Sequence, residues 1–186
     1  GEINTPKYTE AIINSKPDLL IAYGCSIIRE PLLTVFKGRF LNVHLGLSPY
    51  YRGSGTNYWP LVNGEPEYVG ATFMYIDSGI DTGEIIHQIR AKYSWGDTPS
   101  QIGNRFIVEM SLVYRNIIVN FERLEKMSQL PIPSNEKVYK IKDYTEESVV
   151  TLYRNFESGL IERYLNEEVD RCTKVPILTN PALNME

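Results

Sequence analysis

The sequence predicts an α/β fold with a partial doubly wound, Rossmann-like sheet and a small C-terminal helical appendage. An almost unbroken apolar run at 18–23 and an alternating segment at 40–44 flank a short helical stretch, which gives the order strand, helix, strand. A long helical period after Asp97 supplies a helix to cover the sheet. A change of character after these elements divides the chain into a core, residues 1–130, and an appendage, residues 131–186.

The N-terminal elements alternate helix and strand. Asn4-Thr-Pro6 is typical of a helix entry and opens a short helix. The run at 18–23 is short and apolar, as in a strand that is buried on both faces of a parallel sheet. Gly24 allows a tight turn towards a helix around Pro31–Phe36, and the next strand is expected at Phe40–His44.

The middle of the chain reads as a loop followed by two strands. The loop at 48–60 carries aromatic residues, an arginine and glycines, and leads into a short helix near Trp59–Val62. Strands are expected at 68–75 and 84–93. The glycine-punctuated loop at 77–83 joins them and can carry a side chain over the end of a strand.

Helical periodicity dominates the remainder. Asp97-Thr-Pro99 supplies caps and a first-turn proline. Apolar residues then recur at steps of three or four: Ile102, Phe106, Met110, Val113, Ile117, Phe121 and Leu124. Residues 137–141 are expected to form a short strand. A further helix is expected from Thr145 to about Glu168, weakened in its middle by Gly159.

Composition excludes several classes of protein. The 186 residues are 42% hydrophobic, enough to bury a core, and the net charge of −4 with scattered Lys and Arg weighs against a large nucleic-acid surface. Residues 131–186 hold seven Lys and Arg against ten Asp and Glu, the wrong sign for an RNA-binding tail. No apolar run approaches the roughly 20 residues that span a bilayer, and no signal peptide opens the chain, so a cytoplasmic protein is expected. Cys25 and Cys172 lack metal-ligand spacing and predict neither a metal site nor a disulfide framework.

Three polar side chains form the candidate catalytic site. Asn42 and His44 alternate with apolar residues, so both project from one face of their strand. Asp81 lies in the glycine-punctuated loop. A carboxamide, an imidazole and a carboxylate suit acyl transfer to an amine. Hydrogen-bond donors stabilise the negative charge that develops on the carbonyl oxygen, and the carboxylate accepts the proton that the attacking amine loses. A carboxylate close to the imidazole also favours the imidazolium form. The simpler alternative is a hydrogen-bonded pair in the core.

Two sequence blocks, residues 42–53 and 70–88, resemble the signature of the folate-dependent formyltransferases. Asn-Val-His-Leu-Gly-Leu-Ser-Pro-Tyr-Tyr-Arg-Gly is similar to the family's first block, and Asp-Ser-Gly-Ile-Asp-Thr-Gly-Glu-Ile to its second. The resemblance is clear from about Lys16 to Tyr93. It implies an enzyme of one-carbon metabolism that uses 10-formyltetrahydrofolate, and it places Asn42, His44 and Asp81 on the family's catalytic residues.

The resemblance also implies where the folate lies. The segments that match the family's folate-binding wall and its closing loop contain Ser26, Ile27, Ile28, Leu33, Asp77 and Ser78. Two positions depart from the family pattern. Gly46 stands where serine is usual and Ser48 where leucine is usual, which predicts altered acceptor contacts after the histidine.

The loop at 48–60 suits one wall of the acceptor site. Arg52 is a candidate to bind a phosphate or carboxylate, with a structural ion pair as the alternative. Tyr50 and Trp59 are candidates to stack on a base or sugar, with packing inside their own domain as the alternative. The partner is expected to be a small-molecule amine that carries phosphate. Neither nucleic acid nor membrane is expected as a partner, and a homo-oligomer is compatible with the sequence.

Several functions fit the resemblance. The leading expectation is formyl transfer to an activated amino sugar, followed by methionyl-tRNA and then glycinamide ribonucleotide as the acceptor. Formyltetrahydrofolate hydrolysis and a non-catalytic folate-binding remnant are the alternatives. Members of the family open with a strand and a glycine-bearing turn that nothing before Asp18 supplies. The chain is therefore expected to be a truncated product, a divergent short form or a piece of a longer protein.

Overall fold

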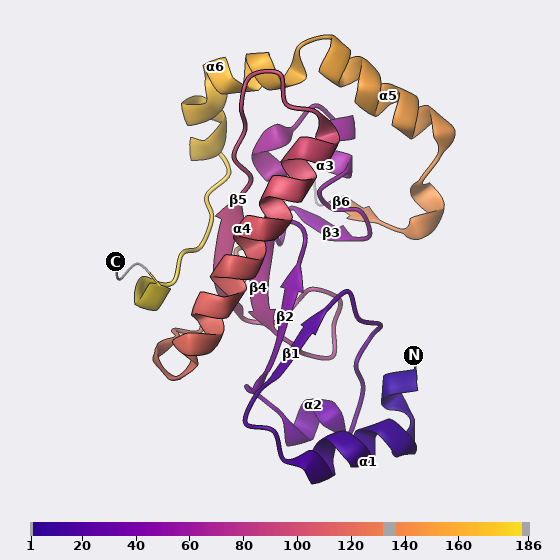
Figure 1. Ribbon diagram of the computed structural model, residues 1–186, viewed down its shortest axis with the longest axis vertical. Helices are drawn as coiled ribbons and strands as arrows, with labels where there is room; N and C mark the ends of the chain where they lie inside the picture. Colours follow the sequence, from indigo (N-terminus) through magenta and orange to yellow (C-terminus); the bar gives the residue numbers. More distant parts are fainter. Residues whose placement is uncertain (1, 132–136, 184–186) are drawn as a thin grey trace.

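A mixed four-stranded sheet lies at the centre of the computed structural model, which describes residues 2–131 and 137–183 (Figure 1). The strand order is β1-β2-β4-β5, in which β1 and β2 are parallel and the other neighbours are antiparallel. A separate two-stranded parallel sheet pairs β3 with β6. The strands are β1 (Leu20–Tyr23), β2 (Phe40–His44), β3 (Tyr51–Gly53), β4 (Gly70–Tyr75), β5 (Ile85–Arg90) and β6 (Lys137–Tyr139).

Helices surround this sheet. The α-helices are α1 (Pro6–Ser15), α2 (Leu32–Val35), α3 (Trp59–Val62), α4 (Pro99–Val119), α5 (Glu146–Glu157) and α6 (Leu160–Thr173). The 3₁₀ turns are η1 (Glu2–Asn4), η2 (Pro66–Tyr68), η3 (Phe121–Arg123), η4 (Ile141–Asp143) and η5 (Pro181–Leu183). Figure 1 shows α1 and α2 at the β1 end of the molecule, with α5 and α6 arching over the opposite end.

The long helix α4 covers one face of the sheet (Figure 1). It begins with a capping box between Thr98 and Gln101, which satisfies backbone donors of the first turn. Its buried stripe joins the sheet in one hydrophobic cluster and consists of Ile102, Phe106, Met110, Tyr114 and Ile117. Tyr114 takes the buried place predicted for Val113, and the helix ends at Val119, before the predicted Phe121 and Leu124. This cluster fixes the face of the sheet opposite the polar residues of β2.

A second, smaller cluster fixes the turn after β1. Ile28, Leu32 and Phe36 pack against Ala22 and Phe40. The cluster therefore ties the segment that follows β1 to both parallel strands.

Three expectations from sequence were wrong. β1 forms an edge of the sheet, and its Ile21 and Tyr23 side chains are 53% and 52% exposed rather than buried on both faces. The loop at 48–60 contains strand β3. The expected helix from Thr145 is broken into α5 and α6 at Gly159, whose φ of 82° lies in the left-handed region.

The C-terminal segment packs into the same core as the sheet. Leu152, Leu160 and Ile161 belong to the cluster under α4, and Asn180 is fully buried. Asn180 Nδ2 donates to the backbone carbonyls of Ile86 and Glu125, at 2.9 and 2.8 Å. Across residues 2–131 and 137–183, no helix has the length and apolar character that crossing a membrane requires.

Candidate active site

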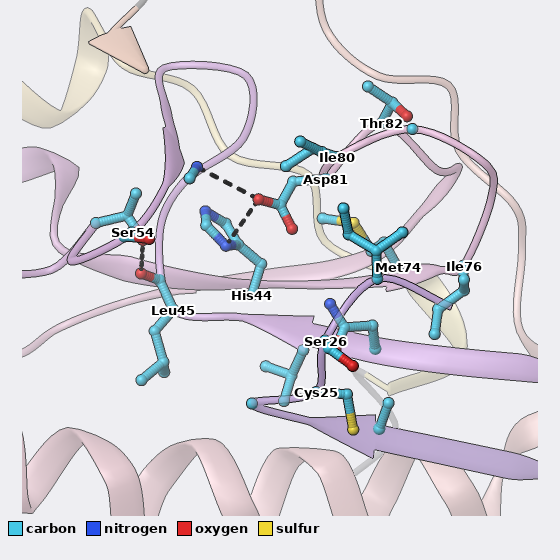
Figure 2. A pocket seen from close by; sticks show the side chains of 18 of the residues that line it. Cys25, Ser26, His44, Leu45, Ser54, Met74, Ile76, Ile80, Asp81 and Thr82 are labelled. Atoms are coloured by element: carbon cyan, nitrogen blue, oxygen red, sulfur yellow. Dashed lines mark hydrogen bonds and ion pairs between the residues drawn. The ribbon is translucent and has the colours of Figure 1, made fainter. Parts of the chain in front are cut away.

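A cleft of about 1210 Å³ opens beside the carboxyl ends of β1 and β2 (Figure 2). Its position agrees with the general rule that ligands of such sheets lie beyond the strand ends. In Figure 2 the loop with Ile80 and Asp81 and the turn with Cys25 and Ser26 border the pocket on different sides of His44. The lining comes from residues 22–29, 42–45, 53–58, 74–77, 79–83 and 138–142.

His44 and Asp81 form a largely buried pair on this cleft. His44 Nδ1 lies 3.3 Å from Asp81 Oδ2, and the two side chains are only 6% and 14% exposed. His44 Nε2 lies 3.0 Å from the backbone carbonyl of Tyr51. A carbonyl and a carboxylate can only accept hydrogen bonds, so both ring nitrogens face acceptors. These two contacts fix the orientation of the imidazole ring on the cleft.

Asn42 lies two residues before His44 on β2 and also lines the cleft. The described part of the chain gives its carboxamide no hydrogen-bond partner, so the group is available to a ligand. The structure therefore brings the three predicted catalytic residues to one cleft. It differs from the expectation in one respect: both His44 nitrogens already have protein partners, whereas Asn42 does not.

Local bonds hold the loop that carries Asp81. Asp77 Oδ1 accepts from the backbone NH of Gly79 at 2.9 Å and from Thr82 Oγ1 at 2.8 Å. Gln129 Nε2 donates to the Gly83 carbonyl at 2.7 Å. A Cβ at Gly83 would lie 1.8 Å from the Tyr75 carbonyl, so the loop needs glycine there. These bonds fix the loop that presents Asp81.

Most of the predicted folate-contacting residues line the cleft. Ser26, Ile27 and Ile28 come from the turn after β1, and Asp77 from the loop opposite. Asn4 holds that turn, because its side chain bonds both the Ile27 carbonyl and the Arg29 amide at 2.8 Å. The lining does not include Leu33, which packs against the second hydrophobic cluster, or Ser78.

The three candidate acceptor-contacting residues lie outside the lining. Trp59 is buried, with its ring stacked on Tyr139 at 4.3 Å between centroids. Tyr50 packs edge-on against Tyr68, and its hydroxyl donates to the Pro176 carbonyl at 3.4 Å. Arg52 donates to the Ile80 carbonyl at 3.0 Å. In this structure each of the three side chains therefore contacts the protein's own segments.

Sequence reasoning missed the segment 138–142, which forms part of the cleft wall. It follows β6 and brings Tyr139, Lys140 and Lys142 to the lining. The alternation of basic and apolar residues from Lys137 to Lys142 predicted a strand here, but it did not indicate that the strand pairs with β3 beside the cleft.

The other histidine has a structural role. His87 lies on β5, and its Nδ1 accepts from the backbone NH of Asn180 at 3.0 Å. Burial lowers the pKa of His87 below its usual value. Within residues 2–131 and 137–183, no group of three or more His, Cys, Asp and Glu side chains is arranged to hold a metal ion.

Solved structures of formyltransferases resemble this chain. PseJ from Anoxybacillus kamchatkensis, solved with UDP-4,6-dideoxy-4-formamido-L-AltNAc and tetrahydrofolate, is 32% identical with a TM-score of 0.58, over 70% of this chain and 68% of that one. WlaRD, a sugar 3N-formyl transferase solved with dTDP and 5-N-formyl-THF, is 27% identical with a TM-score of 0.58, over 68% of this chain and 46% of that one. Phosphoribosylglycinamide formyltransferase from Streptococcus pneumoniae is 25% identical with a TM-score of 0.54, over 62% and 66%. The predicted Rossmann-like formyltransferase fold is confirmed.

Sequence relatives point to the same family. Methionyl-tRNA formyltransferases of Alkaliphilus oremlandii and Desulforamulus reducens are 34% and 33% identical over 69% and 73% of this chain. The chain spans 41% and 42% of the lengths of these relatives, less than half of each. The formyl transferase family itself matches residues 2–117, which is more than half of the sequence. The chain therefore belongs to the formyl transferase family.

Proposed function

We propose that this chain carries the catalytic core of an N-formyltransferase, with the core in residues 1–130. It moves a formyl group from 10-formyltetrahydrofolate to a primary amine. The observation that carries the proposal is the His44–Asp81 pair, 3.3 Å apart and largely buried, beside an unengaged Asn42 carboxamide on one cleft. A small carbonyl group can be polarised only by side chains that converge on it.

Each of the three residues has a distinct role in this proposal. The Asn42 carboxamide donates a hydrogen bond to the formyl oxygen as negative charge develops there. The His44 ring, held between Asp81 and the Tyr51 carbonyl, lies next to the same point. Asp81 accepts the proton that the attacking amine loses, directly or through water. The folate nitrogen that loses the formyl group takes up a proton in its place.

The cleft has the surfaces that a flat heterocycle needs. Ile27 and Ile80 both line it and are 52% and 54% exposed, so a bound pterin would cover apolar surface on both. Ser26 and Asp77 supply polar groups at the same walls. When bound, 10-formyltetrahydrofolate supplies an activated formyl group; the residues named here hold it and orient that group towards His44.

An activated amino sugar that carries phosphate is the proposed acceptor. Arg29, Lys140 and Lys142 line the cleft, and the described residues give none of them an ion pair. Cationic side chains without partners suit a diphosphate. PseJ was solved with a UDP-linked sugar and WlaRD with dTDP, which supports the same class of acceptor.

Methionyl-tRNA is the second candidate acceptor. It is favoured by the curated relatives, which are methionyl-tRNA formyltransferases. The ten acidic against seven basic residues of the segment 131–186 weigh against it, because an RNA-binding surface needs positive charge.

An acceptor screen tests the proposal. The purified protein is incubated with 10-formyltetrahydrofolate and, separately, UDP-linked and dTDP-linked amino sugars, methionyl-tRNA or no amine, and the products are identified by mass spectrometry. A formylated amino sugar is the expected product. Formylated methionyl-tRNA would select the second candidate, and formate released without an amine would indicate a hydrolase. Folate binding without turnover under every condition would contradict the enzymatic proposal.

A further inference from the structure

One short strand supplies backbone partners to both members of the His44–Asp81 pair. The Tyr51 carbonyl lies 3.0 Å from His44 Nε2, and the Gly53 amide donates to Asp81 Oδ2 at 3.4 Å. Both groups belong to β3. The geometry of the pair therefore depends on where the backbone of β3 lies.

β3 pairs with β6 in a sheet of its own, and the turn that precedes it is tied to the central sheet, where the Ser48 amide donates to Thr72 Oγ1 at 3.0 Å. Tyr51 pairs with Lys137 and Gly53 with Tyr139 in a two-stranded ladder. The Lys137 amide donates to the Tyr50 carbonyl at 3.2 Å, and the Ser54 amide donates to the Tyr139 carbonyl at 2.9 Å. A strand from the C-terminal segment thus pairs with the backbone that contacts His44 and Asp81, although the two strands lie more than 80 residues apart in the sequence.

The ladder depends on a close approach at Gly53. Its φ is 90°, a conformation that side chains rarely adopt, and a Cβ there would lie 2.1 Å from the Tyr139 carbonyl. Any larger residue would separate β3 from β6 at the point where the Gly53 amide reaches Asp81.

Side chains lock the other end of the ladder. Tyr51 is 1% exposed, and its hydroxyl donates to the Glu65 carboxylate. Lys137 Nζ lies 3.1 Å from the same hydroxyl and 2.5 Å from Glu65 Oε2, so it joins the two strands through their side chains. Asn63 Nδ2 donates to the hydroxyl at 2.7 Å. Burial raises the pKa of Tyr51, which keeps the hydroxyl protonated as a donor.

We propose that Lys137 and the Tyr51 hydroxyl are positioning residues that lock β6 to β3 and so hold the Tyr51 carbonyl against His44 and the Gly53 amide against Asp81. Neither side chain touches the reacting atoms in this proposal. The kinetic part of its test rests on the proposed formyl transfer, whereas the spectroscopic part does not.

The kinetic test uses Lys137→Met in the intact protein. Because a small displacement of catalytic groups is costly, kcat is expected to fall about 10- to 100-fold, with KM for 10-formyltetrahydrofolate changed less than about threefold. Lys137→Arg, which keeps the positive charge, is expected to recover most of the loss. The matched control is Lys92→Met, which removes an exposed lysine paired with Glu109 at 2.7 Å. This control is expected to leave kcat unchanged.

The spectroscopic test follows the His44 ring by NMR. The chain has two histidines, so His87→Asn assigns the signals. A protected Nε2–H of His44 is expected in the wild type and is expected to weaken or vanish in Lys137→Met. Tyr51→Phe, which removes only the hydroxyl, gives a second variant should Lys137→Met fail to fold.

The two readouts separate the proposals. If the wild type transfers no formyl group but the His44 Nε2–H signal changes in Lys137→Met, the proposed function is contradicted and the positioning role is supported. A folded Lys137→Met or Tyr51→Phe protein whose His44 Nε2–H signal matches the wild type would overturn the positioning role, whatever its activity.

Discussion

At the scale of single residues, Asp81 combines a strained backbone with a place in the proposed catalytic site. Its φ of 53° lies in the left-handed region, which costs a residue with a Cβ about 1–2 kcal/mol. The bonds of Asp77 to Gly79 and Thr82 hold the loop in that shape. Such conformations persist where the surrounding structure imposes them, and they concentrate at functional sites. The strain is consistent with a carboxylate that must meet His44 at a fixed point.

Replacement of the pair should abolish most of the activity. We expect His44→Ala and Asp81→Asn each to lower turnover by about two to four powers of ten, because each removes a group proposed to act at the reacting centre. Steady-state kinetics with the acceptor found in the screen provide the measurement, and circular dichroism checks that the variants fold. Near-normal turnover in either folded variant would remove that residue from the catalytic assignment.

Gly46 is expected to be essential for the geometry of His44. A Cβ at this position would lie 2.6 Å from His44 Nε2 and 2.7 Å from Thr56 Cβ. We therefore expect Gly46→Ser to displace the imidazole and to lower kcat about 10- to 100-fold, even though serine is usual at this position in the family. The matched comparison is Gly103→Ser in α4, where no heavy atom lies within 4 Å of a built Cβ, and this variant is expected to keep the wild-type kcat. If Gly46→Ser kept full kcat, the space around the ring would not be limiting.

The convergence of the candidate catalytic side chains on one cleft could be predicted from sequence, but their backbone partners could not. Strand alternation placed Asn42 and His44 on one face, and the family motif added Asp81. The Tyr51 carbonyl is a main-chain group that every residue possesses, so no residue type marks it. The burial of Trp59 depends on Tyr139, which lies in another part of the chain.

At the scale of elements, local sequence signals predicted where α4 begins, but they could not predict which distant strands pair. The capping residues of α4 placed its start correctly, and residues 137–139 form a strand as the sequence predicts. β3 was missed because its three residues pair with a strand 86 positions further on. The apolar run of β1 predicted burial, but a run does not specify how many strands or helices lie beside it.

Two glycines give opposite predictions for stability. Gly159 separates α5 from α6 at a φ of 82°, so Gly159→Ala is expected to reduce the free energy of unfolding by about 1–2 kcal/mol. Gly103 lies inside α4 with no heavy atom within 4 Å of a built Cβ, so Gly103→Ala is expected to increase it by about 0.5–1 kcal/mol. Urea unfolding measures both. Stabilisation by Gly159→Ala would show that α5 and α6 tolerate a continuous helix.

At the scale of the whole molecule, the C-terminal segment closes the fold onto β5. Leu178 accepts from the Gln88 amide at 2.7 Å, and Asn180 binds β5 with both its backbone and its side chain. The segment also packs α5 and α6 into the core. The stability of the sheet and the placement of the C-terminal segment are therefore expected to be coupled.

Acid should weaken that closure through His87. Burial lowers its pKa in the folded state, so the unfolded chain binds the proton more readily. The stability that neutral His87 contributes is present above the unfolded pKa of about 6.5 and is lost as the pH falls below it. We expect the free energy of unfolding to decrease between pH 7 and 5.5, and to decrease less in His87→Asn. Equal pH dependence in the two proteins would show that carboxylates alone account for the loss.

The arrangement of β6 also limits how the proposed active site can evolve. The strand proposed to position the His44–Asp81 pair runs within three residues into the stretch that ends at Lys142 on the cleft wall. A mutation that adapts this wall to a new acceptor therefore acts on a segment that shares its backbone with the alignment of His44 and Asp81. The effects of substitutions that change acceptor specificity and of substitutions that restore the rate should therefore depend on one another. Insertions between Lys137 and Lys142 should be removed by selection more strongly than insertions in other exposed loops.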